Sequence, residues 1–290
     1  MKRICLFALL FILLYRGDLP AQSPEFKIPN GCKEKYFLTS DSVRLRYLVA
    51  GNGEALIFIP GWTMTAEIWE LQIEYFAKTN MVIALDPRGQ GKSDAVTEGL
   101  YFEREARDVK ELTDHLKLSS YYLIGWSWAG PMLYYYAKLY NSPALKGIVE
   151  VDPPLRITDA FLQRLAKRMK GLLHDRDGTI AEFVKGLFKP PVSETYLQKV
   201  IEGCLMTNTT SAVTMLAIFF SYDDAEWIQL LKEIDKPILF IGADGKQDAH
   251  EQLNKEVKIN YLIVPGAGHT VFIDKPVEFN KAVKDFISKK

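Results

Sequence analysis

The chain has 290 residues, and its 36 Lys and Arg residues balance 36 Asp and Glu residues, so the formal net charge is zero. This balance argues against a polyanionic partner such as nucleic acid, which calls for a basic excess. A hydrophobic content of 48% with 25% charged residues is ordinary for a globular protein, and it excludes a disordered or collagen-like chain.

The N-terminal 21 residues have the pattern of a secretory signal peptide. Lys2 and Arg3 precede an unbroken apolar stretch at 4–15, and cleavage is expected after the small residue Ala21. The apolar stretch is shorter than the roughly 20 residues that span a bilayer, which favours cleavage over the alternative of an uncleaved N-terminal anchor. We therefore expect a secreted or periplasmic protein without stable membrane insertion after cleavage.

Three cysteines are present, and the first of them, Cys5, would leave with the signal peptide. Cys32 and Cys204 could pair in an oxidising compartment. Two cysteines so far apart in the sequence do not form a disulfide framework, so their pairing stays open.

Short runs rich in apolar, β-branched and aromatic residues are expected to be strands. They lie at 43–49, 55–60, 81–86, 121–126, 147–152, 237–242 and 260–265. Between them lie segments with a helical period, such as 101–116, whose apolar residues share one face. Such alternation predicts an α/β protein with a mostly parallel sheet that is covered by helices on both sides.

The segment 156–232 interrupts this alternation, because it contains no clear strand but several amphipathic stretches separated by Gly and Pro breaks. We interpret it as a helical lid inserted between two strands of the sheet. The expected organisation is a signal peptide at 1–21, a first part of the core at 22–155, the lid at 156–232 and a second part of the core at 233–290.

Ser127 stands in the stretch GWSWAGP, which follows the expected strand 121–126 and precedes a helical stretch. A strand-turn-helix context of this kind forces the serine into a strained backbone conformation and exposes its hydroxyl. Small residues are needed at Gly125, Ala129 and Gly130, since larger side chains would collide where the helix begins.

Four segments, taken in chain order, resemble those of the α/β-hydrolase fold family. They are PGW at 60–62, DPRGQGKSD at 86–94, GWSWAGP at 125–131 and PGAGHTVFIDKPVEFN at 265–280. PGW is similar to the family's oxyanion loop, although Pro60 replaces the usual histidine. The resemblance extends over nearly all of the mature chain and implies the α/β-hydrolase fold.

The same resemblance implies a nucleophile at Ser127 and a catalytic base at His269, because a serine hydroxyl needs an imidazole to take its proton. The backbone N–H groups of Trp62 and Trp128 would donate to the developing oxyanion. The remaining histidines are expected elsewhere: His115 on a charged helix, His174 in a lid turn and His250 in a polar loop.

The acid of this triad is harder to place, since Lys246 stands where family members usually carry it. Asp152, at the end of the strand 147–152, is favoured, because a group of small esterases in the family carries its acid after this strand. Asp248 and Asp244 are the alternatives, and a purely structural role for Asp152 also stays open.

The expected function is that of a cofactor-independent serine hydrolase of small carboxylic esters, thioesters or lactones, with an acyl-enzyme on Ser127. Dehalogenases and epoxide hydrolases of the family carry an aspartate at the nucleophile position, so Ser127 argues against both. The alternative is a non-catalytic or weakly catalytic ligand-binding protein of the same fold.

The expected partner is a small-molecule substrate with an apolar acyl part, and neither a cofactor nor a metal is expected. The polar run 242–251 is interpreted as a solvated loop rather than a metal site. Aromatic lid residues could line an acyl pocket, but packing in the core is an equally good interpretation for them. These residues are Phe219, Phe220, Tyr222 and Trp227.

Overall fold

The computed structural model describes residues 28–288. The signal peptide predicted at 1–21, and Cys5 with it, lie outside the described residues. In the described part of the chain Cys32 and Cys204 are both free thiols. Burial raises the pKa of the Cys204 thiol to about 12.

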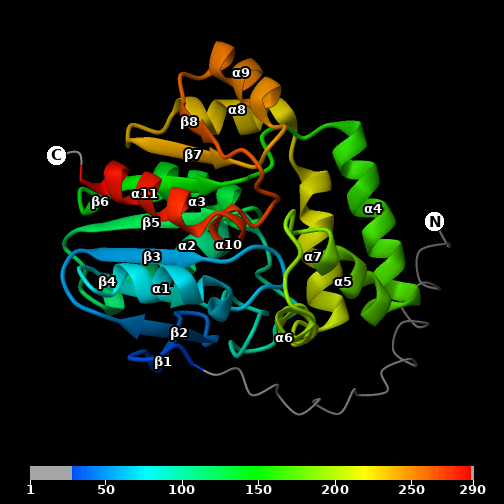
Figure 1. The fold of residues 1–290 in the computed structure, drawn as a ribbon, viewed down its shortest axis with the longest axis horizontal. Coiled ribbons are helices and arrows are strands. Elements are labelled where there is room, and N and C mark those ends of the chain that lie inside the picture. Colours follow the sequence, from blue (N-terminus) through cyan, green and yellow to red (C-terminus); the bar gives the residue numbers. More distant parts are fainter. Residues whose placement is uncertain (1–27, 289–290) are drawn as a thin grey trace, which may run out of the picture.

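A mixed sheet runs through the centre of the molecule, with the strand order β1-β2-β4-β3-β5-β6-β7-β8 (Figure 1). The strands are β1 (Lys33–Leu38), β2 (Arg44–Ala50), β3 (Ala55–Ile59), β4 (Met81–Leu85), β5 (Tyr121–Trp126), β6 (Leu145–Val151), β7 (Ile238–Gly242) and β8 (Asn260–Ile263). β2 is antiparallel to both of its neighbours, whereas all pairs from β4 through to β8 are parallel. The predicted mostly parallel sheet is confirmed.

Helices cover both faces of this sheet (Figure 1). α1 and α11 pack together on one face, and α2, α3 and α8 pack together on the other. Their bounds are α1 (Glu70–Phe76), α2 (Phe102–His115), α3 (Ala129–Tyr140), α8 (Asp224–Lys232), α10 (Val271–Asp274) and α11 (Pro276–Ile287), with the short 3₁₀ helix η1 (Ala66–Trp69) preceding α1. β3 and β5 are buried along their whole length, as strands covered on both faces must be.

The chain between β6 and β7 contains no strand, and its first four α-helices form a group beside the sheet, whereas α8 returns to pack on α3 (Figure 1). It comprises α4 (Asp159–His174), α5 (Arg176–Lys185), α6 (Glu194–Leu205), α7 (Thr209–Ile218), the 3₁₀ helix η2 (Phe219–Ser221) and α8. Each of its α-helices begins at a side chain that accepts a hydrogen bond from a backbone N–H of the first turn, which stabilises the helix start. These caps are Thr158, Asp175, Ser193, Asn208 and Asp223.

Neither β1 nor α7 was predicted from the sequence. β1 lies at the edge of the sheet, where most of its side chains are exposed or half-buried, so it lacks the apolar run of the central strands. α7 has the sequence TTSAVTMLAI, in which hydroxyl-bearing and apolar residues are not segregated to opposite faces, so it shows no amphipathic period.

The prediction of a solvated loop at 242–251 is wrong for most of that run. α9 (Gln247–Glu256) begins there, and His250, predicted in a polar loop, is only 1% exposed and stacks on Tyr261. Burial lowers the pKa of His250 and so favours the neutral ring. Gln247, Asp248 and Glu251 lie on the exposed side of this helix, and His250 on its other side packs on Phe240 and Tyr261 of the sheet.

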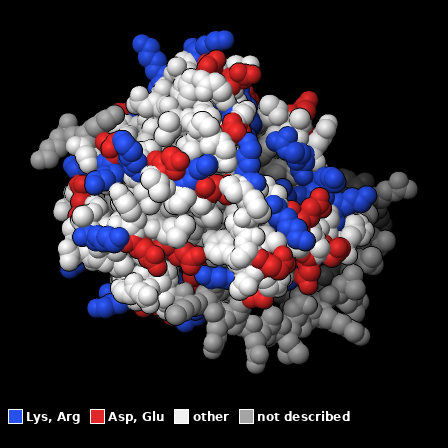
Figure 2. Space-filling view, viewed as in Figure 1, with Lys and Arg blue, Asp and Glu red and all other residues white. Residues whose placement is uncertain are grey.

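The surface carries Lys and Arg interspersed with Asp and Glu on the face shown in Figure 2, in keeping with the zero net charge. Among residues 28–288 no single helix is long and apolar enough to cross a membrane, although α6 and the α7–η2 segment meet that test together with an 84° bend between them. Within the same range no group of His, Cys, Asp and Glu is arranged to hold a metal ion.

Candidate active site

Ser127 lies in the tight turn between β5 and α3. Its φ of 55° is in the left-handed region, which a non-glycine residue adopts only under strain. The turn leaves no room at its flanking glycines: a Cβ on Gly125 would lie 2.7 Å from Leu133, and one on Gly130 would lie 2.8 Å from Pro153. The strained serine with small neighbours, expected from the sequence, is what the structure contains.

Three side chains that are far apart in the sequence form one hydrogen-bonded chain. Ser127 Oγ lies 2.8 Å from Nε2 of His269, and Nδ1 of His269 lies 2.6 Å from Oδ2 of Asp152. The other carboxylate oxygen of Asp152 accepts a hydrogen bond from the backbone N–H of Ala243 at 3.1 Å. Each member follows a strand of the parallel sheet: Ser127 follows β5, Asp152 follows β6 and His269 follows β8.

The charge on Asp152 decides which ring nitrogen carries the proton. Burial would raise the pKa of Asp152, but the hydrogen bond from His269, the charges of His269 and Lys246 and the Ala243 N–H together lower it. An ionised carboxylate only accepts hydrogen bonds, so Nδ1 of His269 donates to it. Nε2 of a neutral ring is then an acceptor that faces the hydroxyl of Ser127.

The two alternative acids lie elsewhere. Asp244 is exposed and pairs with Lys189, and it also accepts the backbone N–H of Gly266. Asp248 is exposed in the first turn of α9. In the described chain the carboxylate beside His269 is that of Asp152.

The loop that carries Trp62 runs from β3 to η1, and buried charged side chains fix its position through hydrogen bonds. Asp86 accepts the backbone N–H of Ala66 at 2.6 Å, and it also accepts from the guanidinium of Arg46 at 3.0 Å. Arg46 reaches Glu67 at 2.7 Å with another nitrogen. The segment DPRGQGKSD therefore fixes the start of η1, and with it the position of the loop that contains the Trp62 N–H.

The two proposed oxyanion donors belong to buried residues at the site. Trp62 is 4% exposed and Trp128 is 3% exposed, and both line the same cavity as Ser127 and His269. Trp128 is the N-cap residue of α3, so its backbone N–H lies at the positive end of the helix dipole.

The indoles of the site have separate partners. Nε1 of Trp62 donates to the carbonyl of Ala212 in α7, and Nε1 of Trp128 donates to Glu105 in α2. Nε1 of Trp126 donates to the backbone carbonyl of His269 at 2.9 Å. This contact between Trp126 and His269 could not be predicted from the sequence, because the two residues are brought together only by the tertiary fold.

A cavity of about 820 Å³ opens above Ser127, between the sheet and the helices that follow β6. Of the four aromatic lid residues considered above, Phe219 lines this cavity. Trp227 is fully buried in the core, Phe220 is half exposed, and Tyr222 donates its hydroxyl proton to Glu103. The pocket interpretation thus fits Phe219, packing against neighbouring elements describes Trp227 and Tyr222, and Phe220 fits neither interpretation.

The cavity is lined by five basic side chains, none of which was predicted as a site residue from the sequence. Its cations are Arg156, Arg164, Lys167, Arg168 and Lys246, and its carboxylates are Asp152 and Glu182. In the sequence the α4 cations have the spacing of the polar face of an amphipathic helix. Such a face is usually exposed to solvent, so the pattern does not indicate a cavity.

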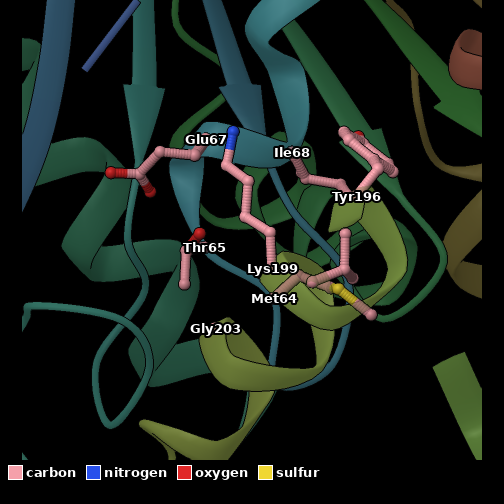
Figure 3. Close-up of a pocket in the computed structure, with 8 residues that line it drawn as sticks. Met64, Thr65, Glu67, Ile68, Tyr196, Lys199 and Gly203 are labelled. Atoms are coloured by element: carbon pink, nitrogen blue, oxygen red, sulfur yellow. The ribbon is translucent and has the colours of Figure 1, made fainter. Parts of the chain in front are cut away.

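A second hollow lies between the loop before η1 and helix α6 (Figure 3). Its free volume is about 10 Å³, and Met64, Ile68 and Tyr196 are among its walls. That is about the space of one water molecule, so this hollow does not admit an organic substrate.

Comparisons with known proteins agree with this architecture. The sequence model of the alpha/beta hydrolase fold matches residues 54–189. The bifunctional esterase/perhydrolase DCH of Acinetobacter calcoaceticus is 31% identical over 278 residues, which cover 87% of this chain and 99% of that protein.

Solved structures of similar fold include the esterase EaEST from Exiguobacterium antarcticum, with a TM-score of 0.81 at 18% identity over 89% of this chain and 100% of that one. A bromoperoxidase from Bacillus anthracis superposes with a TM-score of 0.80 at 20% identity, over the same shares of the two chains. At these sequence identities the similarity to the solved structures shows the fold alone. The chain belongs to the α/β-hydrolase fold family.

Proposed function

We propose that the protein is a serine hydrolase of small carboxylic esters, thioesters or lactones, and that it works through an acyl-enzyme on Ser127. The observation that carries this proposal is the continuous hydrogen-bonded chain from Ser127 through His269 to Asp152 at the floor of a cavity large enough for a small organic substrate.

In the acylation step, Ser127 Oγ attacks the carbonyl carbon of the ester while its proton passes to Nε2 of His269. The carbonyl oxygen becomes an oxyanion, which the backbone N–H groups of Trp62 and Trp128 stabilise. Collapse of this intermediate breaks the bond to the leaving oxygen, which takes the proton from His269. The acyl group then remains on Ser127.

Deacylation repeats these steps with water as the nucleophile. His269 takes a proton from the water as it attacks the acyl carbon, and it returns that proton to Ser127 Oγ when the carboxylic acid departs. The ionised Asp152 stabilises the imidazolium formed in both halves of the cycle. The chemistry uses groups of this chain and water only.

Labelling with a fluorophosphonate, followed by assays on p-nitrophenyl esters, tests this proposal. We expect the full-length protein to be labelled and to release p-nitrophenol, and Ser127→Ala to lose both activities while its unfolding free energy stays within about 1 kcal/mol. Ser119→Ala, at an exposed position, is the matched control. A folded protein with neither activity is instead a ligand-binding member of the fold.

A further inference from the structure

The described cavity has an excess of positive charge that the proposed mechanism does not use. Arg156 contributes little to this excess, because it pairs with Asp224 at 2.9 Å and with Glu256 at 2.7 Å. The other four cations of the lining, three of them on α4, have no carboxylate within ion-pair distance in the described chain. They are Arg164, Lys167, Arg168 and Lys246.

Arg168 is the least exposed of these four cations. Its guanidinium lies 4.3 Å from the ring centroid of Phe183 and 5.4 Å from that of Trp62, so it is held against two aromatic faces. Burial, followed by the charge of Arg164, lowers the pKa of Arg168 to about 10, and Glu182 only partly offsets them. A cation of this kind is poorly compensated by the protein itself.

The arrangement of charges along α4 adds to the uncompensated positive charge. Arg164, Lys167 and Arg168 are spaced i, i+3 and i+4, so their like charges lie on one side of the helix and repel one another. The fully buried residues of α4 are Leu165 and Leu172, so its buried face does not depend on these three charges. An anion in the cavity would remove both the repulsion and the cost of burying Arg168.

We infer that the substrate of this hydrolase carries a carboxylate, which the guanidinium of Arg168 binds beside the ester, with Arg164, Lys167 and Lys246 adding a positive field. A guanidinium held against two rings presents a planar pair of donors that matches a carboxylate. Glu182 in the same lining disfavours a more highly charged group such as a phosphate dianion. The inference rests on the proposed function and names the class of substrate.

Paired esters test it. p-Nitrophenyl hemiadipate carries a free carboxylate on its acyl chain, and p-nitrophenyl heptanoate is a neutral ester of similar length. 4-Carboxyphenyl butyrate and phenyl butyrate form the same comparison for a carboxylate on the leaving group. The readout is the ratio of kcat/KM for the charged ester to that for its neutral partner, because damage to the neighbouring Trp62 would affect both esters of a pair.

We expect Arg168→Gln to lower this ratio 10- to 100-fold for at least one pair, mainly through KM, since a charge-assisted hydrogen bond to the substrate is lost. Arg168→Lys should lower this ratio less than Arg168→Gln does, because it retains a positive charge. Lys170→Gln removes an exposed charge from the same helix outside the cavity lining and should leave both ratios unchanged. An unchanged ratio in Arg168→Gln for both pairs overturns the inference.

A binding measurement separates this inference from the proposed function. Monomethyl adipate is titrated calorimetrically into Ser127→Ala and into Ser127→Ala combined with Arg168→Gln. At least tenfold weaker binding to the second protein supports the anion site even if no ester is hydrolysed. Suppose that the wild-type protein hydrolyses no ester. The inference is then overturned if monomethyl adipate binds to neither protein, or if it binds equally well to both. If the protein is not labelled by the fluorophosphonate but still binds monomethyl adipate in a way that depends on Arg168, the proposed function is contradicted and the anion site is not.

Discussion

The indole Nε1 of Trp126 donates a hydrogen bond to the backbone carbonyl of His269, and the two rings lie 5.3 Å apart. The residue directly before the proposed nucleophile therefore holds the segment that carries the proposed base. β5 and the loop after β8 are far apart in the sequence. This contact joins them next to Ser127 and His269, so it helps to set the distance from Ser127 Oγ to His269 Nε2.

Trp126→Phe should accordingly lower kcat about tenfold with a small change in KM. The ring still fills most of the space, but the loss of one hydrogen bond lets the backbone of His269 move, and about 1.4 kcal/mol of barrier corresponds to a factor of ten. Steady-state kinetics on a p-nitrophenyl ester give both parameters.

Trp69→Phe is the matched control for this experiment. Trp69 is also fully buried, but its contacts are with core aromatic rings, and its indole nitrogen has no hydrogen-bond partner in the described structure. It should lose stability without a comparable loss of kcat. An equal fall in kcat for both variants would show that Trp126 acts through general packing.

The identity of the proposed acid gives a second prediction. Asp152→Asn should lower kcat by about 10⁴, because an amide in this position favours the wrong tautomer of His269. Asp244→Asn and Asp248→Asn should each stay within about tenfold of the wild type. Thermal melting must accompany the kinetics, since Asp152 is buried and a misfolded variant would also be inactive. A folded Asp152→Asn with wild-type kcat would contradict this assignment.

Local sequence was sufficient for the fold class and for the turn at Ser127, because strand, turn and helix are contiguous there. The acid could not be settled in the same way. Which carboxylate meets His269 depends on how the ends of β6 and β7 pack, where the N–H of Asp152 bonds to Ile241 and its carboxylate accepts from Ala243. Such contacts between strands leave no pattern in a single sequence.

The helices between β6 and β7 show even more strongly how tertiary packing limits prediction from sequence. The stretch FLQRLAKRMK on α4 predicts an amphipathic helix, but the sequence does not say whether the polar face meets solvent or a cavity. The position of α4 beside the carboxyl ends of the strands decides that Arg168 lines the cavity.

Phe219 and Phe220 give a third prediction. Phe219 lines the cavity, whereas the next residue, Phe220, is half exposed and outside the lining. Phe219→Leu should raise kcat/KM for long-chain p-nitrophenyl esters relative to the acetate about three- to tenfold, because it enlarges the cavity where a long acyl chain would lie. Phe220→Leu should leave this preference unchanged. A uniform loss over all chain lengths in Phe219→Leu would mean that the ring is structural.

The last prediction concerns Glu105, which accepts the indole N–H of Trp128 behind the proposed oxyanion hole. Burial raises the pKa of Glu105 to about 8, more than the indole hydrogen bond lowers it. In the unfolded chain a glutamate releases its proton near pH 4.3, so between about pH 4.5 and 8 the folded state holds the proton and the unfolded state does not. The unfolding free energy therefore falls as pH rises through this window, by about 1.4 kcal/mol per pH unit for this group.

Glu105→Gln removes this titration, so the unfolding free energy of the variant minus that of the wild type should increase steadily from pH 5 to 8. The slope is the result to examine, because a buried amide in this position adds a constant cost of its own. Urea unfolding at four pH values gives the difference, and Glu98→Gln, at an exposed loop position, controls for the loss of one negative charge. A difference that stays constant over this range would mean that Glu105 is ionised in the folded protein, with its charge stabilised by groups other than Trp128.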